Sequence, residues 1–420
     1  MLCFDTYPWQ SVWDSNQPEH IGATISGPPT GWYGDLRRYR EHARGAGIPL
    51  AIYRQTFHAV QDYDHHVFRD PSFSELRLNT FAALAFNTKF FTDFLYNLGA
   101  ASLFAKTFNG SGDTVISTNG LYAEMTDVNR RARNLGKALI RLKPVYNLHN
   151  TNTAYWPSGF PPGPGSDDPA FPTNGYTIRI LFVRGKYISG GVTNFTPIPN
   201  SFLNDPQAAV NSGLHNSLGY SWWESGKNDP YLTGFSTTNT AGVKNSDLHG
   251  DAIISWLTPL DESMDGLTYS NQVYLMVVNG LTDPTGTSAD CLQTINLDFS
   301  NLSGTLTNLI MLDPPSTGQL QTRGLPVFST KRRLSLTLNG GDAVLFKFNT
   351  GAPFVGFYTE PARLTANLHG GKLTIHPGNR WFALPVADHA FTHKHELDDA
   401  HQLVALFFAV CFHGHHDLGC

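Results

Sequence analysis

Four side chains in the first part of the chain have the types and spacing of a ligand-binding edge: Asp5, Tyr7, Arg54 and Gln55. The first pair follows a short apolar segment, and the second pair ends another one. A carboxylate can act as a nucleophile, as an acid or base, or as an acceptor for sugar hydroxyls, whereas a phenol or an amide hydrogen-bonds a ligand. Ligands of parallel α/β folds meet the protein at the carboxyl ends of the strands, so these four residues are the predicted site.

The segment 34–55 determines how these residues are held. Leu36, Tyr39 and Ala43 repeat at helical spacing, and glycines then end the helix before an apolar strand. A helix that leads onto a strand is half of a βαβ unit. The same alternation continues to about residue 145 and favours a parallel α/β fold, with strands expected at 2–7, 50–55 and 90–96 and helices expected after Gly34, at 74–86 and at 121–142.

The helix expected at 121–142 carries charged residues at regular spacing. Glu124, Asp127 and Arg131 follow one another at intervals of three and four residues. Such a pattern is typical of a solvated helix face with local charge pairs. We therefore assign these residues no role in a site.

Four motifs of the first third belong together: Asp5-Thr6-Tyr7-Pro8, the helix and strand at 40–55, Asp70-Pro71-Ser72 followed by Glu75-Leu76-Arg77, and Ala82-Ala83-Leu84-Ala85-Phe86. In this order they resemble the later strands of a (β/α)8-barrel glycoside hydrolase, of the beta-galactosidase-like and agarase-like kind. The resemblance implies hydrolysis of a glycosidic bond in a galactoside-type or related polysaccharide. It also places Tyr96 beside the substrate, and it expects a catalytic acid on an earlier strand that is not in this chain.

The length of this region limits how much of a barrel it can form. A whole (β/α)8 barrel takes about 250 residues, or ~30 for each unit, so residues 1–145 have room for about four or five units. An open piece of parallel sheet leaves an edge unpaired and apolar surface exposed. Either the sequence is a truncated gene product, which we favour, or a partner chain completes the barrel.

The chemistry expected of the first region depends on carboxylates. Most glycosidases use two, about 5 Å apart for retention or about 6.5–9.5 Å apart for inversion. Asp5 is the predicted catalytic residue, because Asp93 falls inside a strand and Glu75 near a helix start, where carboxylates are usually structural. Two functions follow from this. One is a hydrolase, and the other is a carbohydrate-binding or truncated remnant in which Asp5, Gln55 and the aromatic residues bind sugar without cleaving it.

The second half of the chain has a different pattern. Six prolines between 150 and 174 predict a linker at 146–175. Short strand signals then recur over 176–350, and Leu334, Leu336 and Leu338 alternate with polar residues. Asn339-Gly340-Gly341-Asp342 predicts a hairpin turn after this strand. The expected fold class is therefore α/β plus all-β, an incomplete barrel followed by an antiparallel β-sandwich.

The remaining features mainly exclude functions. Residues 351–420 form a histidine-rich tail that is expected to be poorly ordered, and its spacings define no metal site. A net charge of −5 without a basic stripe argues against nucleic acid, and the longest apolar run, 403–412, is far shorter than the ~20 residues of a membrane helix. The four cysteines lie far apart and leave the compartment open. A carbohydrate is the expected ligand, and no cofactor is predicted.

Overall fold

The computed structural model describes residues 1–11, 30–61, 66–94, 102–108, 111, 114–144, 178–181, 184–197, 215–216, 232–239, 252–261, 263–264, 267–269, 272–300, 308–313, 318–328, 330–348, 353–357, 365–369, 372–376 and 382–385. The chain divides into two compact units, one of residues 1–260 with 271–356 and one of residues 261–270 with 357–420. The linker expected at 146–175 and the predicted site residue Tyr96 lie outside the described residues.

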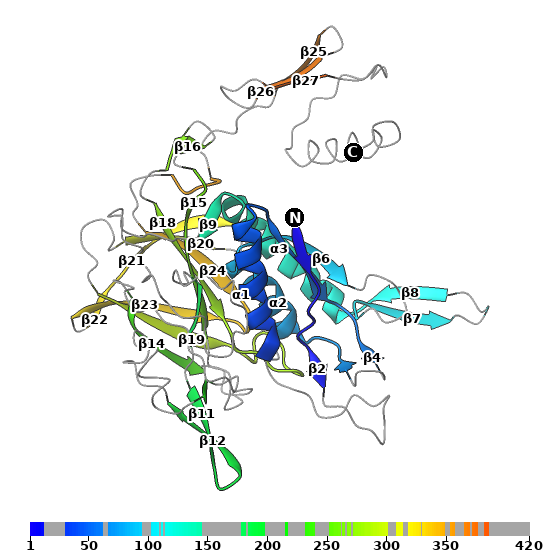
Figure 1. Ribbon diagram of the computed structural model, residues 1–420, viewed down its shortest axis with the longest axis vertical. Helices are drawn as coiled ribbons and strands as arrows, with labels where there is room; N and C mark the ends of the chain where they lie inside the picture. Colours follow the sequence, from blue (N-terminus) through cyan, green and yellow to red (C-terminus); the bar gives the residue numbers. More distant parts are fainter. Residues whose placement is uncertain are drawn as a thin grey trace. The chain divides into compact units, whose positions relative to one another are not determined.

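The first region contains a parallel sheet of three strands. They are β1 (Leu2–Phe4), β3 (Leu50–Gln55) and β6 (Thr88–Phe94), and they lie in that order. All three were predicted. The N-terminus, where β1 begins, and β6 are marked in Figure 1. The described residues do not close this sheet into a barrel, so the structure shows an open α/β layer.

Helices cover one face of the parallel sheet. They are α1 (Thr30–Gly45), α2 (Phe73–Ala85) and α3 (Gly120–Leu139). The Phe4 ring stacks on Tyr39 of α1 with 4.5 Å between centroids, and Arg54 of β3 donates hydrogen bonds to residues of α2 and α3. The start of α2 is fixed by a capping box, in which Ser72 and Glu75 bond each other's backbone N–H groups.

The opposite face of the parallel sheet is only partly covered. Because side chains alternate along a strand, Cys3, Tyr53, Phe90 and Phe94 lie on this face. Cys3 is exposed, and 46% of Phe90 and 38% of Phe94 are accessible. This is the exposed apolar surface that an open parallel sheet leaves. A partner chain that covers it stays a prediction.

The second region forms the predicted antiparallel β-sandwich. One sheet has seven strands, which are β9 (Leu142–Pro144), β10 (Ile178–Leu181), β15 (Ala252–Pro259), β18 (Val273–Asn279), β24 (Ala343–Phe348), β20 (Asn308–Asp313) and β21 (Gln319–Gly324). The other has four, β14 (Leu232–Asn239), β19 (Gln293–Phe299), β23 (Lys331–Leu338) and β22 (Val327–Phe328). Their facing side chains form one apolar core around Trp256, Phe299 and Phe346.

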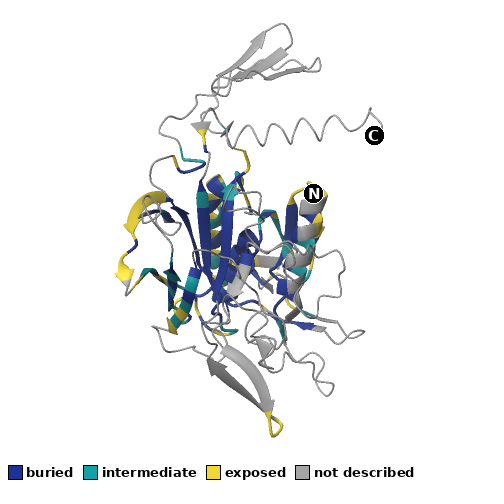
Figure 2. Ribbon diagram, turned by 60° about the vertical axis from the view of Figure 1, so that its left-hand side comes forward, coloured by how far each residue is buried: buried dark blue, intermediate teal, exposed yellow. Residues whose placement is uncertain are grey.

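Helix α2 joins the two regions into one unit. All of its residues from Ser74 to Ala85 are buried, because it packs against β3 and β6 on one side and against β15 and β18 on the other. Strand β9, at the end of the first region, also pairs with β15 of the sandwich. The first unit thus has four layers, namely the parallel sheet, the helices and the two sheets of the sandwich, with the buried residues concentrated at their contacts (Figure 2).

The turn 339–342 does not form the expected hairpin. Strand β23 before it belongs to the four-stranded sheet, and β24 after it belongs to the seven-stranded sheet. The turn therefore crosses from one sheet of the sandwich to the other and reaches α2. A Cβ atom on Gly341, which has φ +74°, would lie 2.3 Å from the Ser74 carbonyl oxygen. The close approach of two backbones explains the glycine here.

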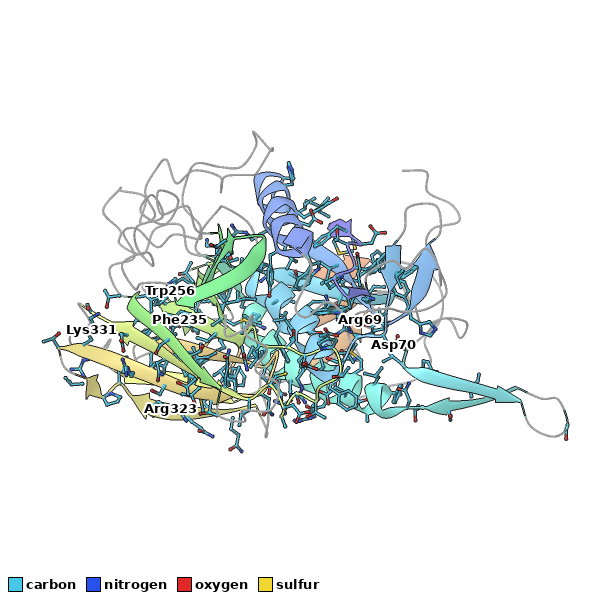
Figure 3. The ribbon with its side chains drawn as sticks, turned by 90° about the horizontal axis from the view of Figure 1, so that it is seen from below. Arg69, Asp70, Phe235, Trp256, Arg323 and Lys331 are labelled. Carbon is cyan, nitrogen blue, oxygen red and sulfur yellow. The ribbon has the colours of Figure 1, made fainter. Side chains whose placement is uncertain are left out.

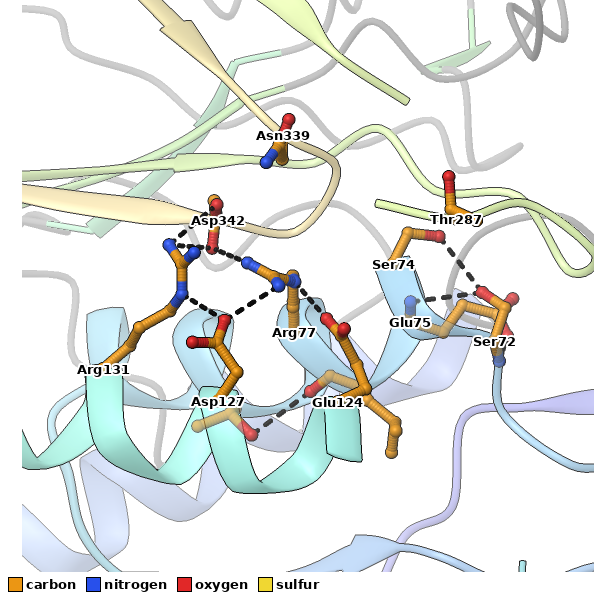
Figure 4. Close-up of polar contacts among 12 residues, drawn as sticks. Ser72, Ser74, Glu75, Arg77, Glu124, Asp127, Arg131, Thr287, Asn339 and Asp342 are labelled. Carbon is orange, nitrogen blue, oxygen red and sulfur yellow. Dashed lines mark hydrogen bonds and ion pairs between the residues drawn. The ribbon is translucent and has the colours of Figure 1, made fainter. Parts of the chain in front are cut away.

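The charged face of α3 does not lie in solvent, so that prediction was wrong. Glu124, Asp127 and Arg131 join Arg77 of α2 and Asp342 of the crossing turn in one ion-pair network (Figure 4). Their spacing on the helix is that of a charged face, as predicted. That face meets another layer of the protein instead of solvent, and the sequence pattern does not distinguish the two cases.

The remaining strands of the described residues form smaller sheets. In the first unit they are β2 (Gln10–Ser11) with β5 (His66–Phe68) and β4 (Ala59–Gln61), β7 (Phe104–Phe108) with β8 (Thr114–Thr118), and β11 (Arg184–Ser189) with β12 (Val192–Pro197) and β13 (His215–Asn216). The second unit contains β16 (Ser263–Met264), β17 (Leu267–Thr268), β25 (Thr365–His369), β26 (Lys372–His376) and β27 (Phe382–Pro385). The last three lie in the histidine-rich segment and were not predicted. No helix among the described residues is long and apolar enough to span a membrane.

Candidate functional site

Asp5 lies directly after β1, at the carboxyl edge of the parallel sheet. Its side chain is exposed, and within the described part of the chain no hydrogen bond or ion pair engages its carboxylate. The neighbouring Thr6 hydroxyl donates to Asp35 of α1 over 2.8 Å. Asp5 is thus a carboxylate that can accept hydrogen bonds from a ligand.

Tyr7 lies beside Asp5 and remains protonated. Burial raises the pKa of its phenol, and the nearby negative charge of Asp5 raises it further. Tyr7 consequently keeps its hydroxyl proton over the whole physiological pH range. It offers a ligand one donor and one aromatic face.

An aromatic platform surrounds Tyr7, and it consists of Tyr7, Tyr53, Phe57, Phe68 and Phe94. The Tyr7 ring stacks on Phe94 at 5.5 Å with 27° between the planes, and it meets Phe57 edge-on at 4.9 Å. Phe68 also contacts Tyr7, at 5.8 Å, and Tyr53 contacts Phe94. Because Tyr7, Tyr53 and Phe94 are partly exposed, the platform presents aromatic surface next to Asp5.

The other two predicted edge residues point elsewhere. Arg54 forms a two-pronged ion pair with Asp93 at 2.8 and 3.0 Å, on the helix-covered face of the sheet. Gln55 is fully buried. Its side-chain amide donates hydrogen bonds to the carbonyl oxygens of Trp9 and Arg69, each over 2.9 Å. Both side chains are engaged by the protein itself, so of the four predicted edge residues that the structure describes it brings together Asp5 and Tyr7.

The other two carboxylates weighed from the sequence are structural, as expected. Asp93 is held by Arg54, and Glu75 forms a buried ion pair with Arg69 at 2.5 and 2.7 Å. Neither is available to a ligand. The described residues therefore supply no second carboxylate through either of them.

A polar cluster of three residues at the same edge was missed from the sequence. The Nδ1 atom of His58 lies 2.9 Å from the Oδ1 atom of Asp70, and the Ser102 hydroxyl donates to the same oxygen. These residues follow β3, follow β5 and precede β7, respectively. Asp70 is seen beside Arg69 on the parallel-sheet side of the unit in Figure 3. No periodic pattern covers these loops, so nothing in the sequence connected the three residues.

Comparisons with known proteins add little to this geometry. No family model matches the chain, and no curated protein matches it. Among solved structures, the chain is similar to a rhamnosidase from Novosphingobium sp. PP1Y at 10% sequence identity and a TM-score of 0.31, over 91% of this chain and 39% of the rhamnosidase chain. The chain thus spans about two fifths of that structure's length.

Proposed function

We propose that this chain is a carbohydrate-binding protein related to glycoside hydrolases, with its site at the carboxyl edge of the parallel sheet. The observation that carries the proposal is the exposed Asp5 carboxylate beside the aromatic platform. A sugar ring has an apolar face that packs on an aromatic ring and hydroxyl groups that donate to a carboxylate. The motifs at 5–8 and 40–55 support the same assignment, with a galactoside-type or related polysaccharide as ligand.

The number of carboxylates without a partner in the protein favours binding without cleavage. Hydrolysis by the usual mechanism needs two carboxyl groups across the scissile bond. Among the described residues near this edge, Asp35, Asp70 and Asp93 each have a partner within the protein, and Asp5 does not. One free carboxylate suffices to hold a sugar.

Hydrolysis is the second candidate. The order of the motifs favours hydrolysis, because the same order of motifs is typical of barrel hydrolases. Asp5 would then be a catalytic carboxylate, and its counterpart would come from residues outside the described ones or from a partner chain. Tyr96 would contribute to substrate binding in either case.

The test is to measure binding and cleavage on the same samples. The ligands are lactose, agaro-oligosaccharides and a β-linked galactan, with affinity measured by isothermal titration calorimetry and cleavage by release of reducing ends. Asp5→Asn removes the charge with little change of shape, and Asp261→Asn, at an exposed aspartate of the second unit, is the matched control.

We expect the wild-type chain to bind at least one of these ligands without cleaving it, and Asp5→Asn to weaken binding about tenfold, as the loss of a hydrogen bond to a charged group does. Cleavage that Asp5→Asn abolishes would establish the hydrolase instead. A folded wild-type chain that binds none of these ligands would refute the proposal.

A further inference from the structure

We propose that His58, held by Asp70 and Ser102, is the hydroxyl-binding residue of the sugar site, with its Nε2 atom facing the ligand. This inference rests on the proposed function and extends it to three residues that were not predicted as site residues, although Asp70 belongs to one of the motifs of the first third. The ligand class is a neutral sugar ring that stacks on the aromatic platform and hydrogen-bonds through a hydroxyl at its rim.

The contact with Asp70 fixes which nitrogen of His58 is free. A carboxylate only accepts hydrogen bonds, so Nδ1, at 2.9 Å from Asp70 Oδ1, carries a proton. In the neutral ring the other nitrogen, Nε2, is then an acceptor, and in the charged ring it is a donor. The side chain is 46% exposed, and in the proposed site Nε2 makes the contact with a sugar hydroxyl in either state.

Asp70 is itself held in place. The Ser102 hydroxyl donates to the same Oδ1 atom, and the Ser102 backbone N–H donates to the Thr56 carbonyl oxygen over 2.8 Å. The Thr56 N–H in turn donates to the carbonyl oxygen of Phe94, a residue of the platform, also over 2.8 Å. Outer hydrogen bonds of this kind fix the orientation of a binding side chain.

The same loops carry the aromatic platform and the polar cluster. Phe57 immediately precedes His58 and contacts Tyr7, and Phe68 comes two residues before Asp70 and contacts Tyr7 as well. Phe57 and Phe68 are themselves buried, so the segments that His58, Asp70 and Ser102 tie together support the exposed rings of the platform from within the protein. This combination of aromatic and polar surface matches the two kinds of surface on a sugar ring.

The alternative is that the cluster only ties three loops together. Two substitutions separate the roles. His58→Asn keeps an amide N–H near the former position of Nδ1, where it can still donate to Asp70, but has no group in place of Nε2. His58→Gln has an amide nitrogen near the former position of Nε2 but lacks the donor to Asp70. His42→Asn, at an exposed histidine of α1, is the matched control.

The experiment combines affinity with chemical footprinting. Titration calorimetry with lactose and agaro-oligosaccharides measures affinity, and thermal unfolding measures stability. We expect His58→Asn to lose about tenfold in affinity at an unchanged melting temperature, and His58→Gln to lose less. In the wild-type chain, bound sugar should slow carbethoxylation of His58 by diethylpyrocarbonate several-fold without slowing that of His42, as peptide mapping would show.

Each other outcome overturns the inference in its own way. Wild-type binding that His58→Asn leaves intact, or a modification rate of His58 that sugar does not change, would refute the role of His58 while the proposed function stands. A lower melting temperature in both His58 variants without a selective loss of affinity would make the cluster a structural tie. A wild-type chain that binds neither sugar would refute this inference together with the proposed function.

Discussion

Arg77 donates a hydrogen bond from Nη1 to the Oδ1 atom of Asp342 over 2.8 Å, although 265 positions of the sequence separate the two residues. Both side chains are almost fully buried. Arg77 belongs to the helical layer, and Asp342 to the turn that crosses between the two sheets of the sandwich. This ion pair therefore fixes the helices against the sandwich.

Removing Asp342 should destabilise the first unit strongly. Asp342→Ala leaves Arg77 and Arg131 without their shared carboxylate in a buried place, and the loss of one partner of a buried pair costs about 3–5 kcal/mol. Urea unfolding would measure this change. Asp298→Ala is the control, because its partner Arg333 lies in a more accessible pair that should contribute at most about 1 kcal/mol. Equal effects of the two substitutions would contradict the role given to Asp342.

Gly341→Ala should be far more costly than the same change at another glycine of similar backbone conformation. Gly341 has φ +74°, and its new Cβ atom would lie 2.3 Å from the Ser74 carbonyl oxygen and 2.5 Å from the Leu78 nitrogen. Gly47 has φ +66° with nothing within 4 Å. We expect about 1 kcal/mol for Gly47→Ala from backbone strain alone and about 3 kcal/mol for Gly341→Ala. Similar free energies of unfolding for the two variants would show that the backbones of α2 and the turn do not pack as closely as the structure has them.

Lys89 should make stability depend on pH in the alkaline range. Burial lowers the pKa of its amine to about 7, and Nζ donates to the carbonyl oxygens of Leu139 and Leu142. The unfolded chain holds this proton up to about pH 10.4, so between these values the unfolded state binds more protons and stability rises with pH. Lys89→Met removes this contribution. Urea unfolding at several pH values from 7 to 10 should show a smaller rise in the variant, and parallel curves would contradict the lowered pKa.

Cys291, which is buried, should be chemically inert. Burial raises the pKa of the Cys291 thiol to about 12, whereas Cys3 is exposed. Since the thiolate is the reactive form, iodoacetamide at pH 8 should label Cys3 in the native protein and Cys291 only after denaturation. Peptide mapping by mass spectrometry separates the two sites. Rapid native labelling of Cys291 would mean that the contact between α2 and the sandwich opens readily.

Local sequence signals located the helices α1, α2 and α3 and the strands of the parallel sheet, but not the smaller sheets or the pairing of residues across the fold. Strand 50–55 was predicted with the bounds that the structure has, because it is an apolar run with turn residues beside it. The glycine pair after β23 correctly indicated a turn, yet a turn signal does not say which sheet receives the next strand. A charged helix face likewise looks the same whether it meets solvent or Asp342.

The site shows the same limit. Asp5 was placed correctly at the end of a strand, because the end of an apolar segment is visible in the sequence. The ion pair between Arg54 and Asp93 was not predicted, because the two residues lie opposite each other only through the register of β3 and β6. His58, Asp70 and Ser102 meet through loops, where side-chain periodicity gives no information. At this site, pairing across the fold is what the sequence left undetermined.

The two exposed phenylalanines of β6 distinguish a binding surface from a merely uncovered one. Phe94 lies at the carboxyl edge, stacked with Tyr7, whereas Phe90 lies four residues earlier on the same face and is accessible to 46%. If sugar binds on the aromatic platform, Phe94→Ala should lower affinity for agaro-oligosaccharides about tenfold through lost stacking, and Phe90→Ala should leave it unchanged. Titration calorimetry measures both, with thermal unfolding to verify the fold. Equal losses would mean that the ligand covers the whole open face, and no loss in either would place the sugar elsewhere.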